Sequence, residues 1–126
     1  MEITLNHTVI PSKNKVEAAR FYEKIFGFEF LKEWDGFAVV KVNSTLTLDF
    51  MNQENFSINH YAFKVTDEQF DEIFARVKAE GLVFGAGHQV TDDGKINNYY
   101  GGRGVYFRDL DGHSLEIQTV DYDLDS

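Results

Sequence analysis

The first half of the chain has a pattern of apolar and polar positions that predicts a strand, a helix and three further strands. Residues 4–10 are expected to form a strand that carries His7. A helix follows, because Asn14 and Glu17 have the spacing of a capping box and Gly27 stands where a left-handed C-terminal cap belongs. Its apolar stripe consists of Ala18, Phe21, Tyr22 and Ile25. Runs rich in β-branched and aromatic residues then predict strands. These runs are residues 28–33, 37–42 and 45–51.

The same order of elements restarts in the second half. Residues 58–65 form a predicted strand that carries His60, and Thr66 with Gln69 has the spacing of a second capping box. The helical stripe that follows consists of Phe70, Ile73, Phe74 and Val77, and it ends at Gly81. The remaining predicted strands are residues 83–86, 104–108 and 114–119, with a polar, glycine-rich insertion over residues 88–103.

This internal repeat defines the expected fold class. Each half would be a βαβββ module, and neither is large enough to be stable alone. We therefore predict an α+β fold in which two such modules form a curved mixed sheet around a shared cavity, with the helices outside. The predicted boundaries are residues 1–54 for the N-terminal module, 55–120 for the C-terminal module and 121–126 for an acidic tail.

Strand parity indicates which side chains face that cavity, because alternate residues of a strand point to opposite faces of the sheet. If Tyr61 packs under the helix, His60 points the other way. Asp49 and Glu116 each lie between apolar neighbours and face the cavity for the same reason. A hairpin between the last two strands would put Tyr106 beside Glu116.

Parity and the repeat together predict a metal site of His7, His60 and Glu116. Two imidazoles and one carboxylate suit a divalent Fe, Mn, Co, Ni or Zn ion and leave coordination positions for water or substrate. Asp49 is the symmetry-related fourth group, and we expect it to act as a proton-transfer base. Glu116 and Asp49 are thus the candidate catalytic carboxylates.

Other polar residues are candidates for substrate binding. Tyr106 and the loop that contains Tyr99, Tyr100 and Arg103 would line or cover the substrate, and Lys64 is a further candidate anion anchor. His113 follows Asp-Gly in a predicted turn, and we expect it to be solvated.

Composition narrows the classes of function. The chain has 126 residues, a hydrophobic fraction of 43% and a formal net charge of −9, which describes a globular and acidic protein. A phosphate backbone or an anionic bilayer prefers a basic surface, so neither nucleic acid nor membrane is an expected partner. The absence of cysteine excludes disulfides and thiolate metal sites. The N-terminal residues do not resemble a signal peptide, so a cytoplasmic location is expected.

The sequence also resembles the vicinal oxygen chelate superfamily, which includes glyoxalase I, bleomycin-resistance proteins, fosfomycin-resistance enzymes and extradiol dioxygenases. The resemblance covers nearly the whole chain and rests on His7 and three segments. These are FYEKIFGF at residues 21–28, NHYAFKV at 59–65 and GVYFRDLDGHSLEI at 104–117. It implies paired βαβββ modules, a homodimer, and a divalent metal held at His7, His60 and Glu116. Asp49 is one methylene shorter than the group usual at its position in glyoxalase I.

Two functions follow as hypotheses. The first is a metal-dependent enzyme of lyase, isomerase or ring-cleavage dioxygenase type, whose metal chelates two adjacent oxygens of a small substrate. The alternative is a metal-free dimer, like the bleomycin-resistance proteins, that sequesters an aromatic or drug-like ligand. Aromatic residues make up 15% of the chain, which suits a planar ligand.

Overall fold

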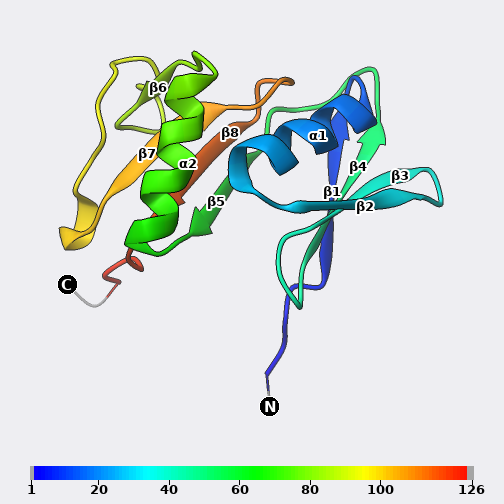
Figure 1. Ribbon diagram of the computed structural model, residues 1–126, viewed down its shortest axis with the longest axis horizontal. Helices are drawn as coiled ribbons and strands as arrows, with labels where there is room; N and C mark the ends of the chain where they lie inside the picture. Colours follow the sequence, from blue (N-terminus) through cyan, green and yellow to red (C-terminus); the bar gives the residue numbers. More distant parts are fainter. Residues whose placement is uncertain (1, 125–126) are drawn as a thin grey trace. The chain divides into compact units, whose positions relative to one another are not determined.

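The computed structural model describes residues 2–124 and divides the chain between Ser57 and Ile58 into two compact units. Each unit contains one long helix and one four-stranded mixed sheet (Figure 1). This confirms the predicted α+β class with two βαβββ modules. The last two residues of the predicted acidic tail lie outside the described residues.

The first unit is a four-stranded sheet with α1 packed against it. Its elements are β1 (His7–Ser12), α1 (Lys15–Phe26), β2 (Glu29–Trp34), β3 (Phe37–Lys41) and β4 (Thr47–Asn52). The strand order is β1-β4-β3-β2, with β1 parallel to β4 and the other pairs antiparallel. The helix contacts all four strands.

The second unit repeats this topology. Its elements are β5 (His60–Lys64), α2 (Asp67–Ala79), β6 (Phe84–Gly85), the short 3-10 helix η1 (Tyr99–Gly101), β7 (Gly104–Arg108) and β8 (Ser114–Gln118). The strand order β5-β8-β7-β6 is equivalent to that of the first unit, with β5 parallel to β8. A long irregular connection between β6 and β7 corresponds to the predicted insertion.

Local capping explains where both helices begin. The Asn14 side chain accepts a hydrogen bond from the backbone N–H of Glu17, and α1 ends at Gly27 with a left-handed φ of 80°. At α2, Thr66 and Gln69 form the complete capping box, with each side chain bonded to the other's backbone. Both N-termini are therefore where the sequence predicts them.

Most strand ends differ from the sequence prediction by one to three residues, and the starts of β1 and β5 matter most for the site. β1 begins at His7 instead of residue 4 and continues through Pro11 to Ser12. Proline fits there because β1 lies at the edge of its sheet, where a missing N–H breaks no ladder bond. β5 is likewise shorter than predicted, since it begins at His60. The N-terminal residue of each of these strands is thus a histidine.

Apolar side chains fill the space between each helix and its sheet. In the first unit these include Tyr22, Leu48 and Phe50, and in the second Phe70, Phe107, Leu115 and Ile117. Burial on the helix side sends the intervening residues of β4 and β8 to the opposite face of each sheet. No helix within residues 2–124 combines the length and the apolar character that a bilayer crossing requires.

Candidate metal centre

The two units place chemically similar residues at equivalent points of their sheets. In the first unit His7 pairs in register with Thr47, and Asp49 follows two residues further along β4. In the second, His60 pairs with Ser114, and Glu116 follows two residues further along β8. An imidazole, a hydroxyl and a carboxylate therefore occupy one face of each sheet in the same order.

His60 and Glu116 lie in direct contact. The imidazole Nε2 of His60 is 3.1 Å from Oε1 of Glu116. The Glu116 side chain is 4% exposed and that of His60 is 35% exposed, so the carboxylate is buried while the ring reaches solvent. The pair combines an inner oxygen ligand with an accessible nitrogen.

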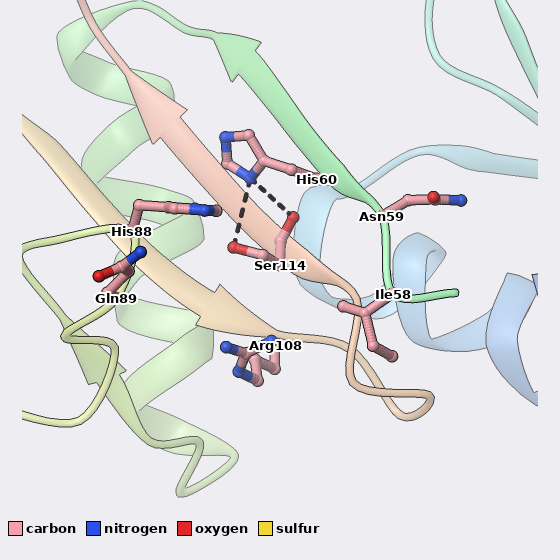
Figure 2. A pocket seen from close by; sticks show the side chains of 7 residues that line it. All are labelled: Ile58, Asn59, His60, His88, Gln89, Arg108 and Ser114. Carbon is pink, nitrogen blue, oxygen red and sulfur yellow. Dashed lines mark hydrogen bonds between the residues drawn. The ribbon is translucent and has the colours of Figure 1, made fainter. Parts of the chain in front are cut away.

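Ser114 contacts the other nitrogen of the His60 ring. Nδ1 lies 3.2 Å from both the backbone oxygen and the hydroxyl oxygen of Ser114 (Figure 2). The carbonyl oxygen can only accept, whereas the hydroxyl can donate or accept, so two arrangements satisfy the ring. In one, Nε2–H donates to the Glu116 carboxylate and Nδ1 accepts from the hydroxyl. In the other, Nδ1–H donates to Ser114, and Nε2 and the carboxylate are both available to one cation.

Tyr106 supports the carboxylate from the neighbouring strand. It pairs in register with Glu116, as parity predicts, and its hydroxyl donates a hydrogen bond to the Glu116 carboxylate. Burial and the negative charge of Glu116 hold the pKa of the Tyr106 phenol well above its ordinary value. The phenol therefore stays protonated and remains a donor across the physiological range.

The first unit contains the corresponding groups in a looser arrangement. The Nδ1 of His7 donates to the side-chain oxygen of Asn6 over 2.8 Å, which leaves Nε2 as the basic nitrogen of an exposed ring. Asp49 is 9% exposed and accepts a hydrogen bond from the Thr47 hydroxyl over 2.9 Å. His7 and Asp49 share a face of the sheet.

The spacing of the His60–Glu116 pair fits a divalent ion. Ligands at neighbouring corners of an octahedron with bonds of about 2.1 Å lie about 3.0 Å apart, close to the observed 3.1 Å. Ligating histidines also usually donate their other ring N–H to an oxygen, and the oxygens of Ser114 lie within hydrogen-bond distance of Nδ1 of His60. Within residues 2–124 no three His, Asp or Glu side chains gather closely enough to form a complete site. The second unit thus supplies two ligands of a potential centre.

Two cavities adjoin this pair within the second unit. The larger, of about 590 Å³, is lined by Ile58, Asn59, His60, His88, Gln89, Arg108 and Ser114 (Figure 2). In it the His88 ring meets that of His60 edge to face, with centroids 5.1 Å apart. The other cavity, of about 180 Å³, contains Tyr99, Tyr100, Tyr106 and Glu116. The loop tyrosines and the Glu116 carboxylate therefore line the same cavity.

Arg103 and Lys64, two candidate anion anchors, both form ion pairs with carboxylates, and Arg103 also lines the smaller cavity. Arg103 forms ion pairs with Asp67 and Asp71 of α2, and its guanidinium stacks on Phe70. These carboxylates raise the pKa of Arg103 above its ordinary value, Asp71 most strongly. Lys64 lies 3.0 Å from the carboxylate of Asp121.

His113 is a residue whose role the sequence did not reveal. Instead of being solvated, it is completely buried. Its Nδ1 accepts a hydrogen bond over 2.9 Å from the backbone N–H of Asn59, the residue before His60. The backbone N–H of His113 donates to the side-chain oxygen Oδ1 of Asp109, and this bond closes the β7–β8 turn. A histidine after Asp-Gly is typical of an exposed turn, and only the pairing of β5 with β8 brings another strand over it.

Comparison with known families agrees with this arrangement. A family model of the glyoxalase/bleomycin resistance protein/dioxygenase superfamily matches residues 4–117. The chain belongs to this superfamily, as its sequence motifs predict.

Individual relatives include transferases and oxidases. The metallothiol transferase FosB of Lysinibacillus sphaericus is 26% identical over 92% of this chain and 82% of its own length. The FosB of Shouchella clausii is 29% identical over 91% of this chain and 79% of its own. Among solved structures, oxidase ChaP-H2 superposes with a TM-score of 0.93 at 37% identity, covering 98% of both chains. Oxidase ChaP-H1 has a TM-score of 0.91 at 42% identity, over 97% of this chain and 99% of its own.

Proposed function

We propose that this protein is a divalent-metal-dependent enzyme that binds two adjacent oxygens of a small organic substrate. His60 and Glu116 would hold the metal, and His7 would supply the third ligand, from the same chain or from a second copy. The observation that carries the proposal is the close approach of two potential ligand atoms, His60 Nε2 and Glu116 Oε1, which lie 3.1 Å apart. An ion bound there would take the lone pair of Nε2, while Nδ1–H would donate to Ser114.

The side chains around the pair have distinct parts in this proposal. A bound divalent ion supplies Lewis-acid polarisation of substrate oxygens. Tyr106 keeps the Glu116 carboxylate oriented through its hydrogen bond. Asp49, which is the counterpart of Glu116 in the first unit, would take and return a substrate proton. The hydrogen bond from Thr47 fixes the orientation of its carboxylate for that role.

The relatives support oxidation ahead of group transfer as the type of reaction. The two ChaP oxidases share 37% and 42% identity with this chain, whereas the two FosB transferases share 26% and 29%. We therefore propose an oxidase or dioxygenase reaction with dioxygen as electron acceptor, which calls for a redox-active ion such as Fe or Mn. A lyase or isomerase reaction is the runner-up, and a homodimer is the expected assembly.

The test is metal content and metal-dependent stability of untagged protein. Wild type should bind about one divalent ion per site. At about 100 times its Kd such an ion stabilises a protein by about 2.7 kcal/mol, or about 10 °C in melting temperature for a chain of this size. His60→Ala and Glu116→Gln should lose both effects while retaining the fold by circular dichroism.

His88→Ala is the matched control, because it removes a second histidine from the same cavity without removing a proposed ligand. It should keep the ion. A wild-type protein that binds no Fe, Mn, Co, Ni or Zn would contradict the enzyme proposal and favour the metal-free binding protein. Undiminished binding by His60→Ala would contradict the ligand assignment.

A further inference from the structure

The smaller cavity of the second unit is surrounded by tyrosines. Its volume is about 180 Å³, and Tyr99, Tyr100, Tyr106 and Tyr122 line it together with Glu116. Of the six tyrosines in the chain, four therefore surround one hollow. We refer to this hollow as the tyrosine pocket.

Three of these rings stand open to solvent. Tyr99 is 52% exposed, Tyr100 55% and Tyr122 54%. Tyr100 and Tyr122 meet edge to face, with ring centroids 5.7 Å apart, although they come from different segments of the chain. Exposed large apolar groups that gather at one place mark binding sites more often than scattered ones do. The rings thus form walls whose faces and edges remain available to a ligand.

The turn that carries two of the rings has a strained backbone and is held by side-chain hydrogen bonds. Tyr100 has a φ of 56°, in the left-handed region that a bulky residue seldom adopts. The buried side chain of Asn97 braces the turn, accepting from the N–H of Tyr99 and donating to the backbone oxygen of Ala86. Strain of this kind persists where the surroundings enforce it, and it concentrates at ligand-binding positions.

Polar groups lie on the inner side of the pocket. The hydroxyl of Tyr106 bonds to Glu116, whose carboxylate also contacts His60. Gln118 adds an amide to the lining. A ligand in the pocket would therefore stack its rings against the outer tyrosines and direct its oxygen atoms toward the His60–Glu116 pair.

From this arrangement we infer that the tyrosine pocket is a subsite for a planar aromatic ring system that carries hydroxyl or carbonyl oxygens. The inference rests on the proposed function for the position of the reacting oxygens, and it names the substrate class of that same site. The volume is below the roughly 300–1,000 Å³ of sites that enclose drug-sized ligands. The pocket therefore takes one or two fused rings.

Calorimetric titration with 2-naphthol tests this inference, with decahydro-2-naphthol as the saturated analogue of similar size. Metal-free wild-type protein should bind 2-naphthol at least several-fold more tightly than decahydro-2-naphthol. The reason is that only the aromatic rings interact favourably with tyrosine faces and edges. Tyr100→Asn and Tyr122→Ala should each weaken 2-naphthol binding by about two- to tenfold. Asparagine is chosen at position 100 because it tolerates the left-handed backbone.

Trp34→Ala is the matched control, since Trp34 is an aromatic residue of the first unit with a similar exposure of 58%. It should leave binding unchanged. Equal affinity for the saturated analogue, or wild-type affinity in both tyrosine variants, would overturn the inference. His60→Ala separates the two proposals: retained 2-naphthol binding in a variant without metal supports the subsite by itself. If wild-type protein binds metal but does not bind 2-naphthol, only the subsite is refuted.

Discussion

Replacement of His113 by leucine tests whether this buried histidine fixes the start of β5. The leucine side chain fills a similar volume but cannot accept the hydrogen bond that the Asn59 N–H donates to His113 Nδ1 over 2.9 Å. The replaced ring is completely buried, so water has poor access to take its place. The variant should therefore loosen the segment that leads into His60.

The expected cost follows from that one bond. A fully buried donor left without its partner costs about 1–3 kcal/mol. The bond from Asn59 is only partly buried, so the lower end of about 1 kcal/mol applies. At about 2.1 cal/mol/K per residue, 126 residues give an unfolding entropy that converts 1 kcal/mol into about 4 °C. His113→Leu should thus lower the melting temperature by about 4 °C.

Amide hydrogen exchange at Asn59 is the decisive measurement. Exchange should accelerate at least tenfold in His113→Leu. His113→Asn is the control, because the asparagine side-chain oxygen can occupy the place of Nδ1 and accept the same bond. That variant loses ring contacts and some stability, yet the Asn59 amide should stay protected. Equal protection of Asn59 in wild type and His113→Leu would refute the reasoning.

Two further predictions concern Tyr106 and the chain turn after β6. The folded-state pKa of Tyr106 is raised, so its stabilising contribution is complete below about pH 10 and is lost as the pH rises above that value. Tyr106→Phe should therefore reduce the loss of stability between pH 8 and pH 11 in urea unfolding, and an unchanged loss would contradict this. Gly85→Ala should destabilise by about 1–3 kcal/mol, because an added Cβ would overlap the carbonyl oxygen of Val90. Gly87→Ala, where the nearest neighbour is 3.8 Å away, should melt within about 2 °C of wild type, and equal losses in both variants would refute the steric reasoning.

The fold could be predicted largely because its signals are local. The Thr66–Gln69 box and the glycine after α1 fix helix ends through bonds between residues three or four apart. Alternation then assigns the faces of β8, and the pairing of Tyr106 with Glu116 follows from the hairpin alone. The starts of β1 and β5 were less predictable, since an edge strand begins where its neighbour's ladder begins and not where its own pattern does.

The candidate site was predictable only in part for a related reason. Parity brought out His60 and Glu116, because both belong to paired strands. The role of His113 depends on contact between residues 54 positions apart in the sequence, which no local pattern encodes. Arg103 lines the smaller cavity, and its ion pairs with two carboxylates of α2 depend on tertiary contacts that its sequence position does not reveal.

The matched His7–Thr47–Asp49 and His60–Ser114–Glu116 positions have a consequence for how this protein could change over evolution. The two sheets each present an imidazole, a hydroxyl and a carboxylate at matched positions. The carboxylate of one module can keep its contact with the histidine, while mutations change the length or orientation of the other carboxylate without unfolding either module. Asp49 differs from Glu116 by a single methylene. One point mutation can therefore convert two carboxylates of equal length into two of different length. New reactions on this scaffold can therefore arise in one module while the other preserves the old chemistry.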